Sequence, residues 1–151
     1  MKIALASDHA GYDLKIGIAQ FLEENNYAYH DFGSGPGEKV DYVDFGVKAA
    51  QGILSGDYDR GILICGTGIG MSITANKFRG IYAALCCDMF MAQMSRRHNN
   101  SNCLTLGGRI LPLDKALHIV ETWLKEDFEG DRHKRRVDKI AELEDINFKS
   151  E

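Results

Sequence analysis

Short apolar runs alternate along the chain with longer segments in which apolar residues recur every three or four positions. The apolar runs predict buried strands over residues 2–7, 27–32, 61–65, 81–85 and 103–106. The segments between them predict helices, including a short one after residue 70, one over 88–98 and a last one over 132–145. Three helical faces are formed by Leu14, Ile18, Phe21 and Leu22, by Val43, Val47, Ala50 and Leu54, and by Leu113, Leu117, Val120 and Leu124 after Pro112.

This alternation of strands and helices indicates a parallel sheet covered by helices on both faces, because parallel strands need crossover connections. The predicted fold is α/β, a three-layer αβα sandwich with a five-stranded, Rossmann-like parallel sheet and an extra C-terminal helix. The length of 151 residues, 44% of them hydrophobic, fits a single domain over 1–151. Ligands of such sheets bind at the carboxyl ends of the strands. We therefore expect the loops that begin at Ser7, Phe32, Cys65, Cys86 and Gly107 to share one edge.

Composition excludes several classes of protein. With 18 Lys and Arg against 22 Asp and Glu, the net charge of -4 argues against a general nucleic-acid binder. The N-terminal apolar run is too short for a signal peptide or a membrane span, so we expect a cytoplasmic protein. The four cysteines form no CxxC pair and no zinc spacing, which predicts reduced thiols and no structural metal site.

Cys65 is the strongest candidate for chemistry, because it ends an apolar strand directly before the turn Gly66-Thr67-Gly68-Ile69-Gly70. Backbone N–H groups and the positive end of a helix stabilise a thiolate, which can act as a base or a nucleophile. The same N–H groups suit a phosphate or a developing oxyanion. The turn is neither a Walker loop nor a dinucleotide fingerprint. A core cysteine and a tight packing turn remain alternatives.

Polar residues elsewhere offer further candidates, each with a structural alternative. Asp8 and His9 follow the first strand and belong to the same edge as Cys65, although Asp8 could simply cap the next helix. His98 and Asn99 end the fourth predicted helix. A histidine at such a position often only stabilises the negative end of the helix dipole.

Arginines supply the candidate anion site. Arg132 and Arg136 lie four residues apart, so one helical face can present two guanidinium groups to a phosphate. A basic run in a terminal helix is also often a solvated face. Arg109 follows the fifth strand and belongs to the ligand edge.

Several segments in this order resemble type B ribose-5-phosphate isomerase over nearly the whole chain. They are Ser7-Asp8-His9-Ala10-Gly11, Asp41-Tyr42, Ile64-Cys65-Gly66-Thr67-Gly68-Ile69-Gly70, Ala75-Asn76-Lys77, Ser95-Arg96-Arg97-His98-Asn99 and Arg132-x-x-x-Arg136. The resemblance implies an enzyme of carbohydrate metabolism, in the pentose phosphate pathway, that interconverts ribose 5-phosphate and ribulose 5-phosphate. It implies no metal or organic cofactor, no nucleic-acid or membrane partner, and a homodimer or a dimer of dimers with shared active sites.

The resemblance also implies roles for individual residues. Cys65 would move a proton between C2 and C1, Thr67 would assist at the oxygen, and His98 would open the furanose ring. The amides of residues 66–70, including those of Gly66, Gly68, Ile69 and Gly70, would hold the enediolate charge. The remaining substrate contacts would come from Asp8, Tyr42 and Asn99 at the sugar and from His9, Arg109, Arg132 and Arg136 at the phosphate. His98, Asn99 and Arg109 would come from the partner of the chain that supplies Cys65.

Two positions differ from those of some relatives: Met71 bears on which residue is the base, and Val43 bears on fine substrate preference. Some relatives use a glutamate base where this chain has Met71, which leaves the duty to Cys65, and many carry proline where this chain has Val43, in a loop near the sugar. Isomerisation of a six-carbon sugar phosphate, allose 6-phosphate or galactose 6-phosphate, is therefore the alternative enzyme function. A phosphosugar-binding regulator without catalysis is the alternative from another class, and a receiver-type signalling module fits less well because no phosphoacceptor Asp ends the third strand.

Overall fold

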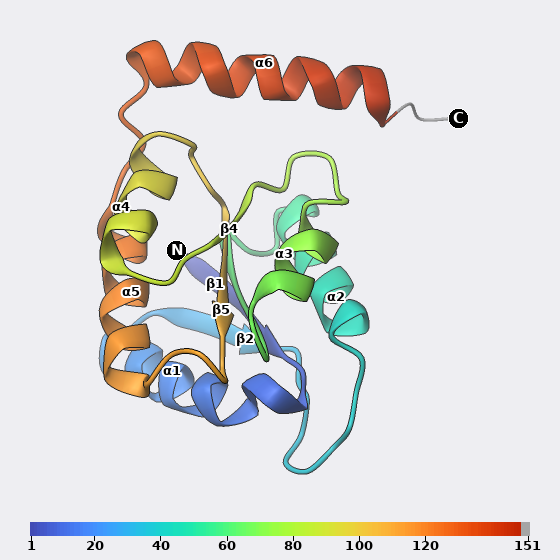
Figure 1. The fold of residues 1–151 in the computed structure, drawn as a ribbon, viewed down its shortest axis with the longest axis vertical. Helices are drawn as coiled ribbons and strands as arrows, with labels where there is room; N and C mark the ends of the chain where they lie inside the picture. Colours follow the sequence, from blue (N-terminus) through green and yellow to red (C-terminus); the bar gives the residue numbers. More distant parts are fainter. Residues whose placement is uncertain (149–151) are drawn as a thin grey trace.

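The computed structural model describes residues 1–148, and the last three positions of the domain predicted over 1–151 lie outside the described residues. Strands and helices alternate as the apolar pattern predicts (Figure 1). In chain order the elements are β1 (Lys2–Ser7), η1 (His9–Gly11), α1 (Tyr12–Glu24), β2 (Ala28–Asp31), α2 (Tyr42–Leu54), β3 (Arg60–Cys65), α3 (Ile69–Ala75), β4 (Ala83–Leu85), α4 (Met89–Arg97), β5 (Cys103–Gly107), α5 (Leu113–Lys125) and α6 (Asp131–Asn147).

The five strands form one parallel sheet in the order β2-β1-β3-β5-β4, which confirms the predicted fold class. One face of the sheet packs against α1, α4 and α5 around Trp123, and the other packs against α2 and α3 around Met71. Strand β2 pairs with one edge of β1, and the chain then crosses back so that β3 pairs with the other edge of β1. This change of direction opens a crevice between the carboxyl ends of β1 and β3.

The buried face of α2 is built from small residues, and the predicted helical face is correct at Ala50 but wrong at Val43 and Leu54. The buried positions of α2 are Gly46, Ala49 and Ala50, whereas Val43 and Leu54 are 44% and 48% exposed. A Cβ atom on Gly46 would lie only 3.2 Å from Sδ of Met71. The helix therefore approaches α3 too closely for a branched side chain at Gly46, and Val43 and Leu54 point outward.

Val43 lies in the first turn of α2 rather than in the loop before it. The sequence-based placement in a loop near the sugar is therefore wrong. Its side chain is exposed on the helix surface.

Helix α6 lies across the end of the molecule opposite the carboxyl ends of the strands (Figure 1). His133 is its one buried residue, and Glu144 anchors its far half by accepting hydrogen bonds from the Gly80 N–H and the Tyr82 hydroxyl. Ile140, Leu143 and Ile146 are 42%, 57% and 62% exposed, so the helix carries an uncovered apolar face. Among residues 1–148, no helix is both long and apolar enough to cross a membrane.

Candidate active site

Cys65 is the last residue of β3, and its thiol receives a hydrogen bond from the chain that follows it. The backbone N–H of Gly68 donates to Sγ across 3.2 Å, and the side chain is 4% exposed. The Gly68 amide therefore fixes the position of the sulfur at the start of the turn. All four cysteines are free, as the spacing predicted.

The glycines hold this turn against the end of β5. Gly68 has a φ of +81°, and a Cβ atom there would lie 2.9 Å from the carbonyl carbon of Leu106. The Gly108 N–H donates to the Cys65 carbonyl at 2.8 Å, and the Arg109 N–H donates to the Gly66 carbonyl at 2.9 Å. Backbone hydrogen bonds thus join the turn after β3 to the turn after β5. They fix the position of the Gly68 amide that donates to the Cys65 thiol.

A cleft of about 430 Å³ opens above this turn at the crevice between β1 and β3. Nine of the predicted site residues line it, namely Asp8, His9, Tyr42, Cys65, Gly66, Thr67, Ile69, Gly70 and Arg109. Ala10 and Ile73 line it too, and the sequence analysis missed both. Ile73 could have been found from the sequence, because it stands one helical turn after Ile69 and so shares its helical face.

Arg109 lies in the cleft of its own chain. Its Nη1 is 3.3 Å from the position of a Cβ atom on Gly66. The expectation that a partner subunit supplies it beside Cys65 is therefore wrong. The short connection after β5 explains the difference, because Arg109 follows the strand by only two residues.

Asp8 combines the two roles that the sequence left open. Its Oδ1 accepts a hydrogen bond from the Gly11 N–H at 3.1 Å, so Asp8 caps the short helix η1. The same side chain lines the cleft, although it is only 6% exposed. His9 is exposed, and its Nδ1 lies 3.2 Å from the Val40 carbonyl oxygen. The Tyr42 ring covers Gly70, where a Cβ atom would lie 2.6 Å from the ring.

A larger hollow of about 790 Å³ lies beside this cleft along the loop before α2. It shares His9 with the cleft and is otherwise lined by residues 39–48, including Lys39 and Lys48. Its lining contains neither Cys65 nor the glycine turn. We therefore place the candidate active site in the smaller cleft, where the thiol, a buried carboxylate and an arginine converge.

Five predicted residues are not part of the cleft lining in the described chain. Gly68 lies within the turn itself, where its amide donates to Cys65 Sγ, and the other four lie elsewhere. His98 is the C-cap of α4, Asn99 follows it, and Arg132 and Arg136 are exposed on α6. A helix that follows a parallel strand runs back toward the amino ends of the strands. The end of α4 and the start of α6 therefore lie at the edge opposite Cys65 (Figure 1).

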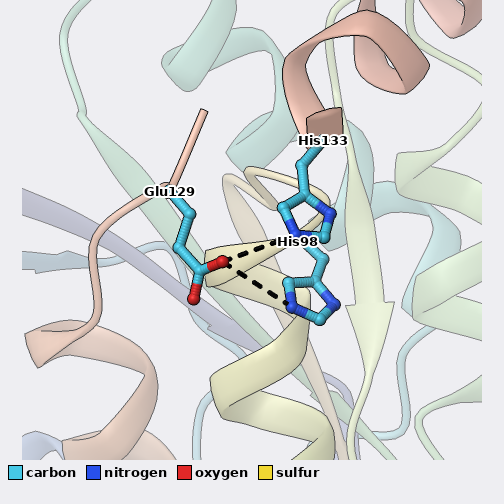
Figure 2. A group of neighbouring side chains, drawn as sticks. All are labelled: His98, Glu129 and His133. Carbon is cyan, nitrogen blue, oxygen red and sulfur yellow. Dashed lines mark ion pairs between the residues drawn. The ribbon is translucent and has the colours of Figure 1, made fainter. Parts of the chain in front are cut away.

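At that opposite edge, His98 belongs to a cluster with Glu129 and His133 (Figure 2). One donor atom from each residue lies within 4.8 Å of the others, a separation that a metal ion could bridge. The two rings are stacked 9° from parallel, however, so their lone pairs do not converge on one point. Arg132 and the first turn of α6 add positive charge nearby. This arrangement does not suit a cation.

The fold and the cleft define an α/β protein with a ligand crevice at the carboxyl ends of its strands. A family model described as Ribose/Galactose Isomerase matches residues 3–140, and the chain belongs to this family. It is 43% identical to ribose-5-phosphate isomerase B of Escherichia coli over 143 residues, which are 95% of this chain and 96% of that protein.

Solved structures agree with this assignment. Ribose-5-phosphate isomerase B of Clostridium thermocellum superposes with a TM-score of 0.95 at 55% identity, covering 97% of this chain and 99% of that one. The enzyme of the same name from Mycoplasma genitalium, solved with bound ribulose 5-phosphate, has a TM-score of 0.90 at 40% identity and covers 95% of each chain.

The glycine turn yields a direct prediction about stability. Gly68→Ala should lower the free energy of unfolding by more than about 2 kcal/mol, because it combines a left-handed residue with a clash against the backbone of β5. Gly37→Ala is the matched control, since Gly37 has a φ of +73° and open space around it, and it should cost only about 1 kcal/mol. Urea unfolding of both variants measures the difference. Equal losses of unfolding free energy would show that the close contact between Gly68 and the β5 backbone is unimportant.

Proposed function

We propose that this enzyme interconverts ribose 5-phosphate and ribulose 5-phosphate through an enediolate, with Cys65 as the base. The observation that carries the proposal is the Cys65 thiol at the end of β3, held by the Gly68 amide and open to a cleft of sugar-phosphate size. Membership of the isomerase family and the names of the relatives support the substrate. No metal or organic cofactor is required for this chemistry.

The reaction moves two protons within the sugar, one from C2 to C1 and one from the C2 oxygen to the C1 oxygen. The Cys65 thiolate takes the proton from C2 of the open-chain aldose, the C2–H electrons form the C1–C2 double bond, and the C1 carbonyl oxygen becomes the enediolate oxygen. The proton returns to C1 as the C2 oxygen becomes the ketone, with Thr67 assisting the transfer between the oxygens. Amides of residues 66–70 stabilise the oxyanion, and the buried Asp8 carboxylate holds sugar hydroxyls.

We further propose that the complete site is shared between two copies of the chain in a homodimer. Cys65 and His98 lie at opposite edges of one molecule, and a single copy cannot bring them to one sugar. In a two-fold dimer, the end of α4 and the start of α6 of one copy reach the cleft of the other. His98 would then open the ring there, Asn99 would orient the sugar, and Arg132 and Arg136 would hold the phosphate together with His9 and Arg109.

The exposed apolar residues of α6 support such a dimer, because Ile140, Leu143 and Ile146 form an uncovered face next to the residues that must cross to the partner. We likewise propose a cytoplasmic location and assembly into a dimer of dimers.

Preference for five-carbon over six-carbon substrates is measured by comparing turnover of ribose 5-phosphate with that of allose 6-phosphate.

Cys65→Ala tests the base. The wild-type protein should isomerise ribose 5-phosphate without added metal, and Cys65→Ala should lower kcat by about 10²- to 10⁴-fold while leaving ligand affinity within a few-fold, because the base is lost and the phosphate contacts remain. Isomerase kinetics and calorimetric titration with ribulose 5-phosphate measure the two effects.

Cys87→Ala is the matched control, because Cys87 is the exposed thiol and lies outside the cleft lining. It should leave kcat unchanged. Substantial turnover by Cys65→Ala would remove Cys65 from the role of base, and a wild-type protein that binds ribulose 5-phosphate without turning it over would instead be a phosphosugar-binding regulator.

Arg132→Ala and Arg136→Ala test the phosphate site. Each should raise KM for ribose 5-phosphate by roughly 10- to 100-fold, because a charge-assisted hydrogen bond contributes about 1.5–3 kcal/mol. Arg135→Ala removes the same charge from a neighbouring exposed position of α6 and should change KM little. If all three variants raised KM equally, general electrostatic attraction would explain the effect, and a specific phosphate clamp would be wrong.

A further inference from the structure

His133 is a buried histidine for which the proposed reaction has no use. Its side chain is 4% exposed, and its Nε2 makes no hydrogen bond within the part of the chain that the structure describes. The ring stacks directly on that of His98, with centroids 3.9 Å apart and planes 9° from parallel (Figure 2). His98 itself is 36% exposed and follows the last residue of α4. The buried His133 ring therefore packs against a His98 ring that is partly exposed to solvent.

Glu129 completes the cluster from the loop between α5 and α6. Its Oε2 lies 3.4 Å from Nε2 of His133 and 3.9 Å from Nε2 of His98, so both rings turn the same edge toward one carboxylate (Figure 2). The backbone N–H of Glu129 donates to the Arg97 carbonyl at 3.0 Å. This bond ties the loop to the end of α4 and sets the carboxylate beside His98.

Charge favours a neutral His133. Burial, the neighbouring His98 and Arg132 lower the pKa of His133, whereas Glu129 opposes them and Arg136 adds to them more weakly. A neutral His133 ring can remain stacked on His98 when His98 takes up a proton, because two adjacent imidazolium charges would repel each other. His133 is thus suited to support a partner that changes its protonation state.

We propose that His133 is a positioning residue that fixes the plane of the His98 imidazole for opening the furanose ring. The inference rests on the proposed function, in which His98 acts on the cyclic sugar. In that step a proton leaves the O1 hydroxyl, the C1–O4 bond breaks as the C1 carbonyl forms, and O4 takes up a proton. An imidazole that carries this proton must lie in the plane of both oxygens, and a ring free to rotate at a helix end would rarely do so.

Ring opening can be separated from proton transfer at carbon by experiment. Ribulose 5-phosphate cannot form a furanose, because its C5 oxygen carries the phosphate, so exchange of a C1 hydrogen with deuterium from solvent requires Cys65 but not ring opening. Turnover of ribose 5-phosphate requires both steps. His133→Leu should therefore lower kcat for ribose 5-phosphate by about tenfold or more and leave the deuterium exchange rate within about twofold.

His133→Phe keeps a flat ring of similar size and should restore most of the turnover that His133→Leu loses. His118→Leu makes the same change at an exposed position on α5 and should alter neither rate. Thermal unfolding of each variant confirms that the compared proteins are folded at the assay temperature.

Equal losses of turnover and exchange in His133→Leu would indicate a structural role and overturn the inference. So would full turnover in His133→Leu, or a His133→Phe variant as slow as His133→Leu. Failure of the proposed function is distinguishable, because the wild-type protein would then show no turnover of ribose 5-phosphate at all.

Discussion

The common direction of the five strands is the constraint on which the site depends. Every turn that follows a strand falls on one edge of the sheet, and every helix that returns the chain ends at the other. Asp8, Cys65 and Arg109 follow strands and meet in one cleft, whereas His98 ends a helix and meets α6 at the opposite edge. In the proposed reaction all these residues act on one sugar, so the proposed site requires a second copy of the chain. Helix α6 offers an exposed apolar face for that copy to cover.

Within the cleft, chemistry and packing depend on the same glycines. The turn after β3 can approach β5 because Gly68 and Gly107 have no side chains, and a Cβ atom on Gly107 would lie 2.8 Å from the Thr67 carbonyl oxygen. That approach lets the β5 loop bond to the turn and orients the Gly68 amide toward Sγ. Preorganised donors of this kind would need no rearrangement when charge develops on the enediolate of the proposed reaction.

Much of this arrangement follows from the sequence, and the exceptions have physical causes. The three central strands β1, β3 and β5 and their shared edge were predictable, because these buried parallel strands are largely continuous apolar runs. The buried face of α2 was not, since glycine and alanine carry little hydrophobic signal although close helix packing selects them. Periodicity also says nothing about the cluster of His98, Glu129 and His133, because a loop and two separate helices bring those side chains together.

Mixing two impaired variants, assayed at a ribose 5-phosphate concentration near the wild-type KM, tests the shared site most directly. Cys65→Ala lacks the base but keeps the residues of α6, and the double variant Arg132→Ala, Arg136→Ala lacks the phosphate arginines but keeps the thiol. After unfolding and refolding together, half of the dimers should be mixed and carry one intact site of two, which predicts recovery of about a quarter of wild-type turnover of ribose 5-phosphate. Turnover no higher than the mean of the two separate variants would contradict an active site built from two copies of the chain.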